Sequence, residues 1–219
     1  VVLVDADTRA ASVAIALGLL DEAPGIAAAC RLAAIGALEH DEPERVSAIL
    51  PGGDASARVL TGIARAGRWP ALSAARAGGV LEACRAWRAF TVVDVAASIE
   101  RDEELLSDAL GPRRAAATIA TLESADVIVL VGAADPVGAA RMIDAAAAIG
   151  DLTSAPMIPV VNRMRAGAIG GVDARRQLVG TLERFGGIRD PILVPLDQAA
   201  ADRALRTALP ITAAAPRSS

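Results

Sequence analysis

The chain has 219 residues, of which 53% are hydrophobic and only 2% aromatic, with no tyrosine, and its net charge is −4 at pH 7. This length suits one ordinary domain with a sizeable aliphatic core. The scarcity of aromatic residues and the acidic balance provide neither a base-stacking platform nor a basic footprint for nucleic acid.

Single residue types exclude further classes of protein. The chain has 22 arginines, one histidine and no lysine. Cys30 and Cys84 lie far apart without CxxC spacing and His40 is the only histidine, which disfavours a zinc site and predicts buried, reduced thiols. No apolar run reaches the roughly 20 residues that cross a bilayer, and no basic leader is present, so we expect a cytoplasmic protein.

The opening stretch Val1–Asp7 is rich in β-branched residues and ends in two acids, Asp5 and Asp7. Such a run predicts a strand that is buried on both faces and carries carboxylates to the end of a sheet. Helical spacing of apolar residues follows over Thr8–Leu20 and again over Gly25–Leu38. The chain therefore starts as a strand followed by helices.

The rest of the chain alternates between strand and helix signals. Phe90–Asp94 repeats the opening pattern of an apolar run that ends in aspartate. The other segments expected are strands over 57–61, 127–131, 157–161 and 192–194, and helices over 71–87, 112–124, 135–149, 173–185 and 197–205. This alternation predicts an α/β fold, a doubly wound, mostly parallel sheet with helices on both faces.

Polar residues follow several of the predicted strands. Because parallel strands bring their carboxyl ends to one edge, we expect Asp5 and Asp7, Asp94 and Asn162 to converge there. Such a set suits Mg²⁺ held through water beside a polar ring, as in a nucleotide site. The simpler alternative is that the acids only cap the next helix.

A phosphate-binding loop is missing from this pattern. The motif GxxxxGK[ST] requires a lysine, which the chain lacks. In the segment GAADPVG, residues 132–138, the two outer glycines also stand one residue too far apart. The chain as given therefore contains no P-loop.

Several stretches taken in order resemble the MinD/ParA group of P-loop ATPases. The resemblance is carried by VVLVDADTRAASVAIALGL, VLTGIARAGRW, TVVDVAAS, ADVIVLVGAADPVGAARMIDAA, PVVNRMR and ILVPLDQAAADRAL. It covers nearly the whole chain and is nearest to the branch of actinobacterial septum-site, chromosome-partitioning and CpaE-like pilus-assembly proteins.

The resemblance implies a switch that dimerises around ATP and hydrolyses it slowly with Mg²⁺, in the cytoplasm or peripherally at membrane or nucleoid. A protein partner would stimulate hydrolysis, whereas DNA or membrane association has no support in the charge. The site residues it implies are Asp7 for the attacking water, Asp5 and Asp94 for Mg²⁺ through its water shell, Asn162 for the adenine edge, and Pro195, Leu196 and Asp197 as a wall for the base.

In this family the first strand, the P-loop and the following helix would precede Val1. We therefore expect residues 1–209 to be an incomplete nucleotide-binding domain and 210–219 a flexible tail. Loss of a central strand leaves backbone groups unpaired, which predicts a marginally stable fragment that binds nucleotide weakly or not at all.

Other readings compete with this one. A response-regulator receiver needs a later lysine, and a dinucleotide-binding domain needs GxGxxG after its first strand; neither is present. ATP-dependent amide-forming and reductase-linked enzymes share the core, but no second-substrate pocket or cluster-binding cysteine pair is evident. The main alternative is a pseudo-ATPase scaffold, with Arg113, Arg114 and residues 163–165 as partner-binding patches.

Overall fold

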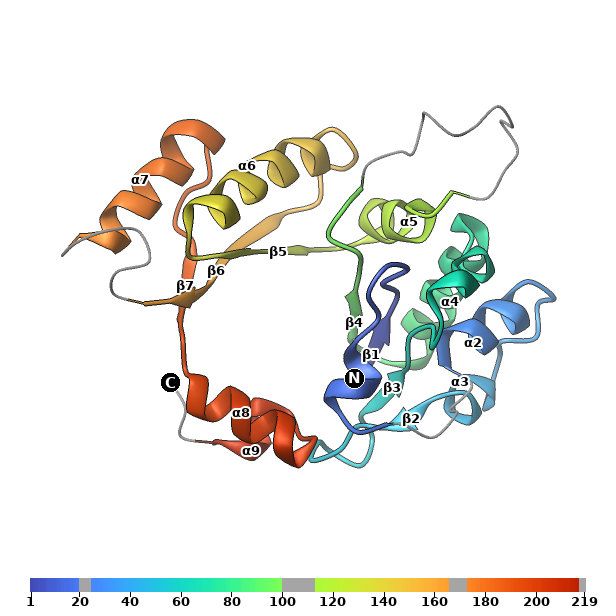
Figure 1. Ribbon diagram of the computed structural model, residues 1–219. Coiled ribbons are helices and arrows are strands. Elements are labelled where there is room, and N and C mark those ends of the chain that lie inside the picture. Colours follow the sequence, from blue (N-terminus) through green and yellow to red (C-terminus); the bar gives the residue numbers. More distant parts are fainter. Residues whose placement is uncertain (20–24, 100–112, 166–172, 217–219) are drawn as a thin grey trace. The chain divides into compact units, whose positions relative to one another are not determined.

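The computed structural model describes residues 1–19, 25–99, 113–165 and 173–216 (Figure 1). It forms two compact units: unit 1 comprises residues 1–124 and 200–218, and unit 2 comprises residues 125–199. The expected end of the first helix at Leu20 and the expected helix start at Pro112 lie outside the described residues. Each unit has its own sheet.

Unit 1 is built on a four-stranded sheet of order β2-β3-β1-β4. Strands β3 (Arg58–Leu60) and β4 (Thr91–Asp94) lie parallel to the central strand β1 (Val2–Asp5) on either side of it. Strand β2 (Ala48–Ile49) pairs antiparallel with β3. The parallel part of this sheet is the part that the apolar runs of the sequence predict.

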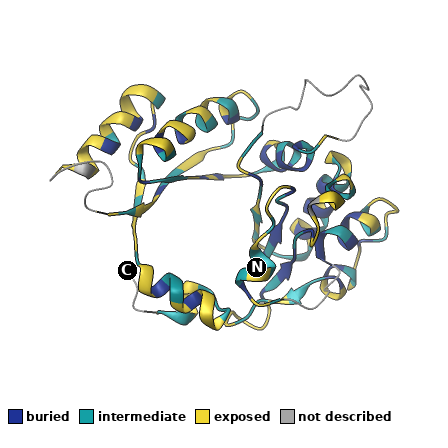
Figure 2. Ribbon diagram, in the orientation of Figure 1, coloured by how far each residue is buried: buried dark blue, intermediate teal, exposed yellow. Residues whose placement is uncertain are grey.

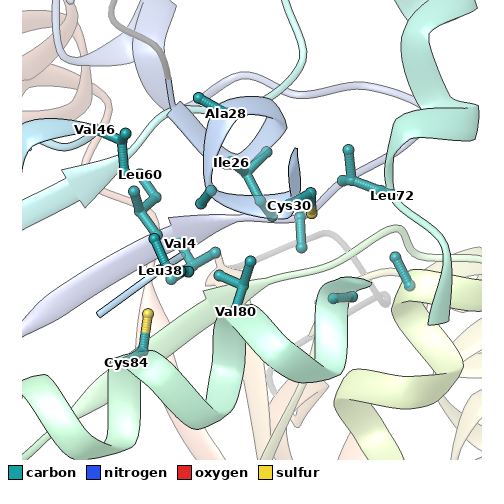
Figure 3. Close-up of a cluster of buried hydrophobic side chains, with 14 of the residues drawn as sticks. Val4, Ile26, Ala28, Cys30, Leu38, Val46, Leu60, Leu72, Val80 and Cys84 are labelled. Atoms are coloured by element: carbon teal, nitrogen blue, oxygen red, sulfur yellow. The ribbon is translucent and has the colours of Figure 1, made fainter. Parts of the chain in front are cut away.

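The core of unit 1 is aliphatic, as the composition predicts. Val2 and Val4 of β1 are fully buried, and residues of α2 (Gly25–Ala33) and α4 (Ala74–Trp87) pack with them (Figure 3). Both cysteines are buried, free thiols in this cluster. The remaining helices of the unit are α1 (Val13–Ala16), α3 (Glu42–Arg45), η1 (Ala66–Ala71), α5 (Ala116–Ser124), α8 (Gln198–Thr207, of which residues 198 and 199 belong to unit 2) and α9 (Ile211–Ala214).

Unit 2 is built on a parallel sheet of order β5-β6-β7. Helices α6 (Pro136–Gly150) and α7 (Ala174–Gly186) lie on the same face of it (Figure 1). The strands are β5 (Ile128–Ala133), β6 (Met157–Met164) and β7 (Ile192–Pro195). In β5 the side chains alternate between buried and exposed, so that one face of the sheet carries exposed valines (Figure 2).

The predicted fold class is confirmed: parallel strands alternate with helices along the chain. The hydrogen bonds, however, define two sheets and not one. Among the described residues β4 pairs only with β1 and β5 only with β6. Each sheet therefore has a strongly apolar strand at one edge, β4 in unit 1 and β5 in unit 2.

Three local predictions differ from the structure. The helix expected over Thr8–Leu20 is reduced to the four residues of α1, because the acids before it hold the chain in a loop through Ser12. Strand β2 was not predicted, since two residues carry too little pattern. Helix α9 lies in the segment 210–219 where a tail is expected.

Candidate functional site

The two acids that end the apolar strands of unit 1 are direct neighbours. Asp5 is the last residue of β1, Asp94 is the last residue of β4, and the two pair in register across the sheet. Asp5 is only 1% exposed, whereas Asp94 is exposed. The prediction that the strands deliver both carboxylates to one edge is met inside unit 1.

The carboxylate of Asp5 is committed to backbone hydrogen bonds. Its Oδ1 accepts from the amide of Asp7 at 3.2 Å and its Oδ2 accepts from the amide of Val13 at 3.1 Å. Burial raises the pKa of Asp5, these two hydrogen bonds lower it in part, and the carboxylates of Asp94 and Asp7 raise it further. Partial desolvation of its carboxyl group likewise raises the pKa of Asp94, with Asp7 as the second cause.

Asp7 lies in the loop directly after β1 and is half-buried. Its Oδ1 accepts from the amides of Arg9 at 2.7 Å and Ala10 at 2.9 Å. Among the described residues its Oδ2 has no hydrogen-bond donor, so this oxygen is able to accept from water or a ligand. The alternative, in which the acids only organise the start of the next helix, accounts for three of the four carboxylate oxygens. Both oxygens of Asp5 and Oδ1 of Asp7 accept from backbone amides of the loop that leads into α1 and of its first residue.

A contact that sequence reasoning missed holds this loop against the start of the α5 segment, and it engages Arg114, which the scaffold alternative assigns to a partner-binding patch. The hydroxyl of Thr8 donates to the carbonyl of Arg114 at 2.9 Å, and the Arg114 guanidinium donates back to the carbonyl of Thr8 from Nε at 3.3 Å and Nη2 at 3.2 Å. The two residues are 106 positions apart, so no local pattern could have shown the contact.

Gly62 is a second missed residue. It follows β3, and a Cβ atom built there would lie 2.6 Å from Oδ2 of Asp5 and 2.6 Å from Cβ of Ala11. Real Cβ contacts are never this short, so a side chain at position 62 would displace the Asp5 carboxylate. The signal in the sequence was a glycine directly after a predicted strand.

The acidic edge does not form a cage for direct metal binding. Among the described residues no group of three or more His, Cys, Asp or Glu side chains is arranged to hold a metal ion. Desolvation is the main cause that raises the pKa of Asp5 and of Asp94, and repulsion from neighbouring carboxylates, from Asp94 and Asp7 on Asp5 and from Asp7 on Asp94, is a smaller cause that a cation nearby would relieve. The residues thus fit an ion held through its water shell and do not fit one bound directly.

The other predicted site residues lie in unit 2, at neighbouring strand ends. Asn162 is exposed on β6, where its Oδ1 accepts from the amide of Arg163 at 2.7 Å. Pro195 ends β7, and the amide of Leu196 donates to the carbonyl of Met164 at 2.9 Å. The structure therefore places Asn162 and Pro195 on the paired strands β6 and β7 of unit 2, and it brings Asp5, Asp7 and Asp94 close together within unit 1. The contact of Asn162 and residues 195–197 with a common ligand stays a prediction. That the two groups meet remains a prediction.

No protein-family model matches the chain, and neither does any curated protein. Solved structures do match. A ParA family ATPase from Chlorobium tepidum superposes with a TM-score of 0.74 at 15% identity, over 99% of this chain and 80% of the other. The fold is that of the MinD/ParA-type P-loop ATPases.

Two archaeal structures agree with this assignment of the MinD/ParA fold. The cell division ATPase MinD of Pyrococcus furiosus gives a TM-score of 0.66 at 16% identity, over 99% of this chain and 79% of the other. The septum site-determining protein MinD of Pyrococcus horikoshii, complexed with Mg-ADP, gives 0.66 at 15% identity, over 99% and 76%. About a fifth of each of these MinD/ParA-type chains therefore lies outside the match.

Proposed function

We propose that this chain is part of a MinD/ParA-type ATPase that dimerises around ATP and acts as a switch in intracellular positioning or partitioning, in the cytoplasm or at its membrane or nucleoid surface. The observation that carries the proposal is the pairing of Asp5 and Asp94 at the carboxyl ends of adjacent parallel strands, within a MinD/ParA fold. Nucleotide-binding α/β sheets place their ligands at such edges.

The residues fit some parts of a nucleotide site. Asp5 and Asp94 would hold Mg²⁺ through its water shell, and the free Oδ2 of Asp7 would orient a water molecule. Asn162 and the segment Pro195–Asp197 would contact the base. Mg²⁺ supplies charge neutralisation at the phosphates when it is bound.

The residues do not fit the phosphates of ATP. The chain has no lysine, and no segment of it has the spacing of a P-loop. Within the ranges that the structure describes, β4 and β5 each have one unpaired edge, and about a fifth of the neighbours' chains lies outside the match. Both observations support the proposal that the complete domain contains a further strand and loop.

A second candidate function is a scaffold with the same fold and no hydrolysis. Two observations favour it: the absence of lysine, and the use of Asp5 and Asp7 as caps of their own loop. In this case the acidic edge maintains the fold and has no ligand.

Mg²⁺-dependent ATP hydrolysis and binding of a fluorescent ATP analogue by the full-length gene product separate the two functions. We expect Asp7→Ala to abolish turnover while binding stays within about threefold of wild type, because in this proposal Asp7 orients the attacking water and does not contact the nucleotide.

Asp151→Ala, at the exposed end of α6, is the matched control and should change neither quantity. Loss of binding in Asp7→Ala would mean that its role is wrongly assigned. Absence of both binding and turnover in the wild type would favour the scaffold.

A further inference from the structure

A groove of about 530 Å³ lies in unit 1 between α4 and the turn that follows α2. One wall is a single stripe of α4: Gly79, Glu82, Ala83, Ala86 and Trp87 stand at helical spacing i, i+3, i+4, i+7 and i+8. The stripe is about 12 Å long, since a helix rises 1.5 Å per residue. We call it the α2–α4 groove.

The opposite wall is the turn over residues 36–40. Gly36 has φ +66°, and a Cβ built there would meet nothing within 4 Å, so there is open space at this position of the wall. His40, also in the left-handed region at φ 53°, closes the turn. Ile35, the residue before Gly36, is 76% exposed and adds apolar surface next to the groove.

Acidic side chains line the groove. Glu39 and Glu82 belong to its walls, and no arginine does so among the described lining residues. Arg45 pairs with Glu42, and Arg85 donates to the carbonyl of Ser124. Arg88 is the cation nearest to the wall: it lies 4.2 Å from the ring centroid of Trp87, where Glu44 is its acidic partner at 3.8 Å.

The side chain of Glu39 is 71% exposed, with His40 as its ion-pair partner at 3.8 Å, while no ion pair involves Glu82 among the described residues. Both carboxylates are accessible to a partner.

We propose that the α2–α4 groove is a docking site for a partner protein that presents a basic amphipathic helix. The small residues of the stripe leave room for an apolar side chain from the partner, as in other helix-in-groove contacts. Glu39 and Glu82 complement arginine or lysine beside that side chain. The site does not involve Asp5, Asp7 or Asp94, so it stands independently of the nucleotide proposal.

Fluorescence anisotropy with labelled 15-residue helical peptides tests the site on the full chain. The panel carries Ala, Leu or Phe in the apolar stripe and either arginine or glutamate beside it. We expect at least one arginine peptide to bind, and its glutamate counterpart to bind at least tenfold more weakly. Glu82→Gln should weaken binding about two- to fivefold, as for exposed ion pairs.

Two variants identify the groove as the place of binding. Ala86→Leu fills the groove from an exposed helical position and should weaken binding at least tenfold. Its matched control is Ala147→Leu at an exposed position of α6, which should bind as wild type does. The double variant Glu39→Arg with Glu82→Arg should reverse the preference, so that the glutamate peptide binds better.

The proposal is overturned if no peptide of the panel binds, if arginine and glutamate peptides bind equally well, or if Ala86→Leu binds as wild type does. Thermal unfolding by circular dichroism verifies that each variant folds. The fluorescence of Trp87 in a Trp69→Phe background gives a second readout, because Trp87 lines the groove and the chain has only two tryptophans.

Discussion

Two strands of nearly the same composition end up in different environments. In unit 1, Val2 and Val4 of β1 are both 0% exposed, with a strand on either side. In unit 2, Val129 and Val131 of β5 are 57% and 58% exposed, and in the part of the chain that the structure describes β5 pairs on one side only. An apolar run thus predicts that a strand forms, but its burial depends on what covers the second face and the second edge.

The largest expected effect tests this difference directly. Val4→Ala should lower the free energy of unfolding by roughly 2 kcal/mol, because it removes buried methyl groups and leaves a cavity. Val131→Ala, the same change in the exposed row of β5, should stay within about 0.5 kcal/mol. Urea unfolding followed by circular dichroism compares the two, and equal losses would show that the exposed face of β5 is covered in solution.

Gly62→Ala should destabilise unit 1 by about 1–3 kcal/mol, the usual result of forcing atoms into filled space. The added methyl group would collide with the Asp5 carboxylate and Ala11. Gly67→Ala is the control, since a Cβ there meets nothing within 4 Å. Urea unfolding gives both values, and unchanged stability of Gly62→Ala would contradict the close approach.

The helix caps of the two units should differ on a smaller scale. Asp135 caps α6 in unit 2 by accepting from the amide of Gly138 at 2.8 Å, whereas Ser73 caps α4 in unit 1 at 3.5 Å. Asp135→Ala should cost about 1 kcal/mol, and Ser73→Ala less, because a longer hydrogen bond is weaker. Hydrogen exchange of the amides in the first turns of α4 and α6 measures the loss of stability in each variant. A larger loss for Ser73→Ala than for Asp135→Ala would contradict the prediction.

The smallest expected effect is a change in the pH dependence of stability. The folded-state pKa values of Asp5 and Asp94 are raised above the ordinary 3.8. Each protonated carboxyl group stabilises the folded state, and this stabilisation is complete below the unfolded-state pKa of 3.8. It is lost as the pH rises through the higher pKa of the folded state. Asp94→Asn should therefore gain stability relative to wild type between pH 4 and pH 7, in urea unfolding at each pH. A constant or falling difference would rule this out.

The repeating strand and helix pattern could be predicted because it is local. Phe90–Asp94 and residues 127–131 are apolar runs bounded by polar residues, and β4 and β5 form within one or two residues of them. The apolar spacing after Asp7 failed to predict a loop, because the competing hydrogen bonds of two carboxylates carry no periodic signal.

The acidic edge could be predicted in part for the same reason. The alternation predicts parallel strands, which bring Asp5 and Asp94 to the same edge of the sheet. The direct pairing of β1 with β4, which makes the two acids neighbours, comes from the structure. The contact of Thr8 with Arg114 could not be predicted, since its residues are joined only by the tertiary fold. Gly62 has no room for a side chain because the Asp5 carboxylate lies next to it in the fold, and the sequence alone does not predict this contact either.

The two buried thiols of unit 1 are probes of how often its core opens. Burial raises the pKa of Cys30 to about 11 and that of Cys84 to about 12. At pH 7 at most about one thiol in ten thousand is then ionised while the core is closed, so alkylating reagents react slowly unless the core opens. Both cysteines of the chain belong to unit 1. The rate of labelling therefore reports how often unit 1 alone exposes its interior, whatever unit 2 does.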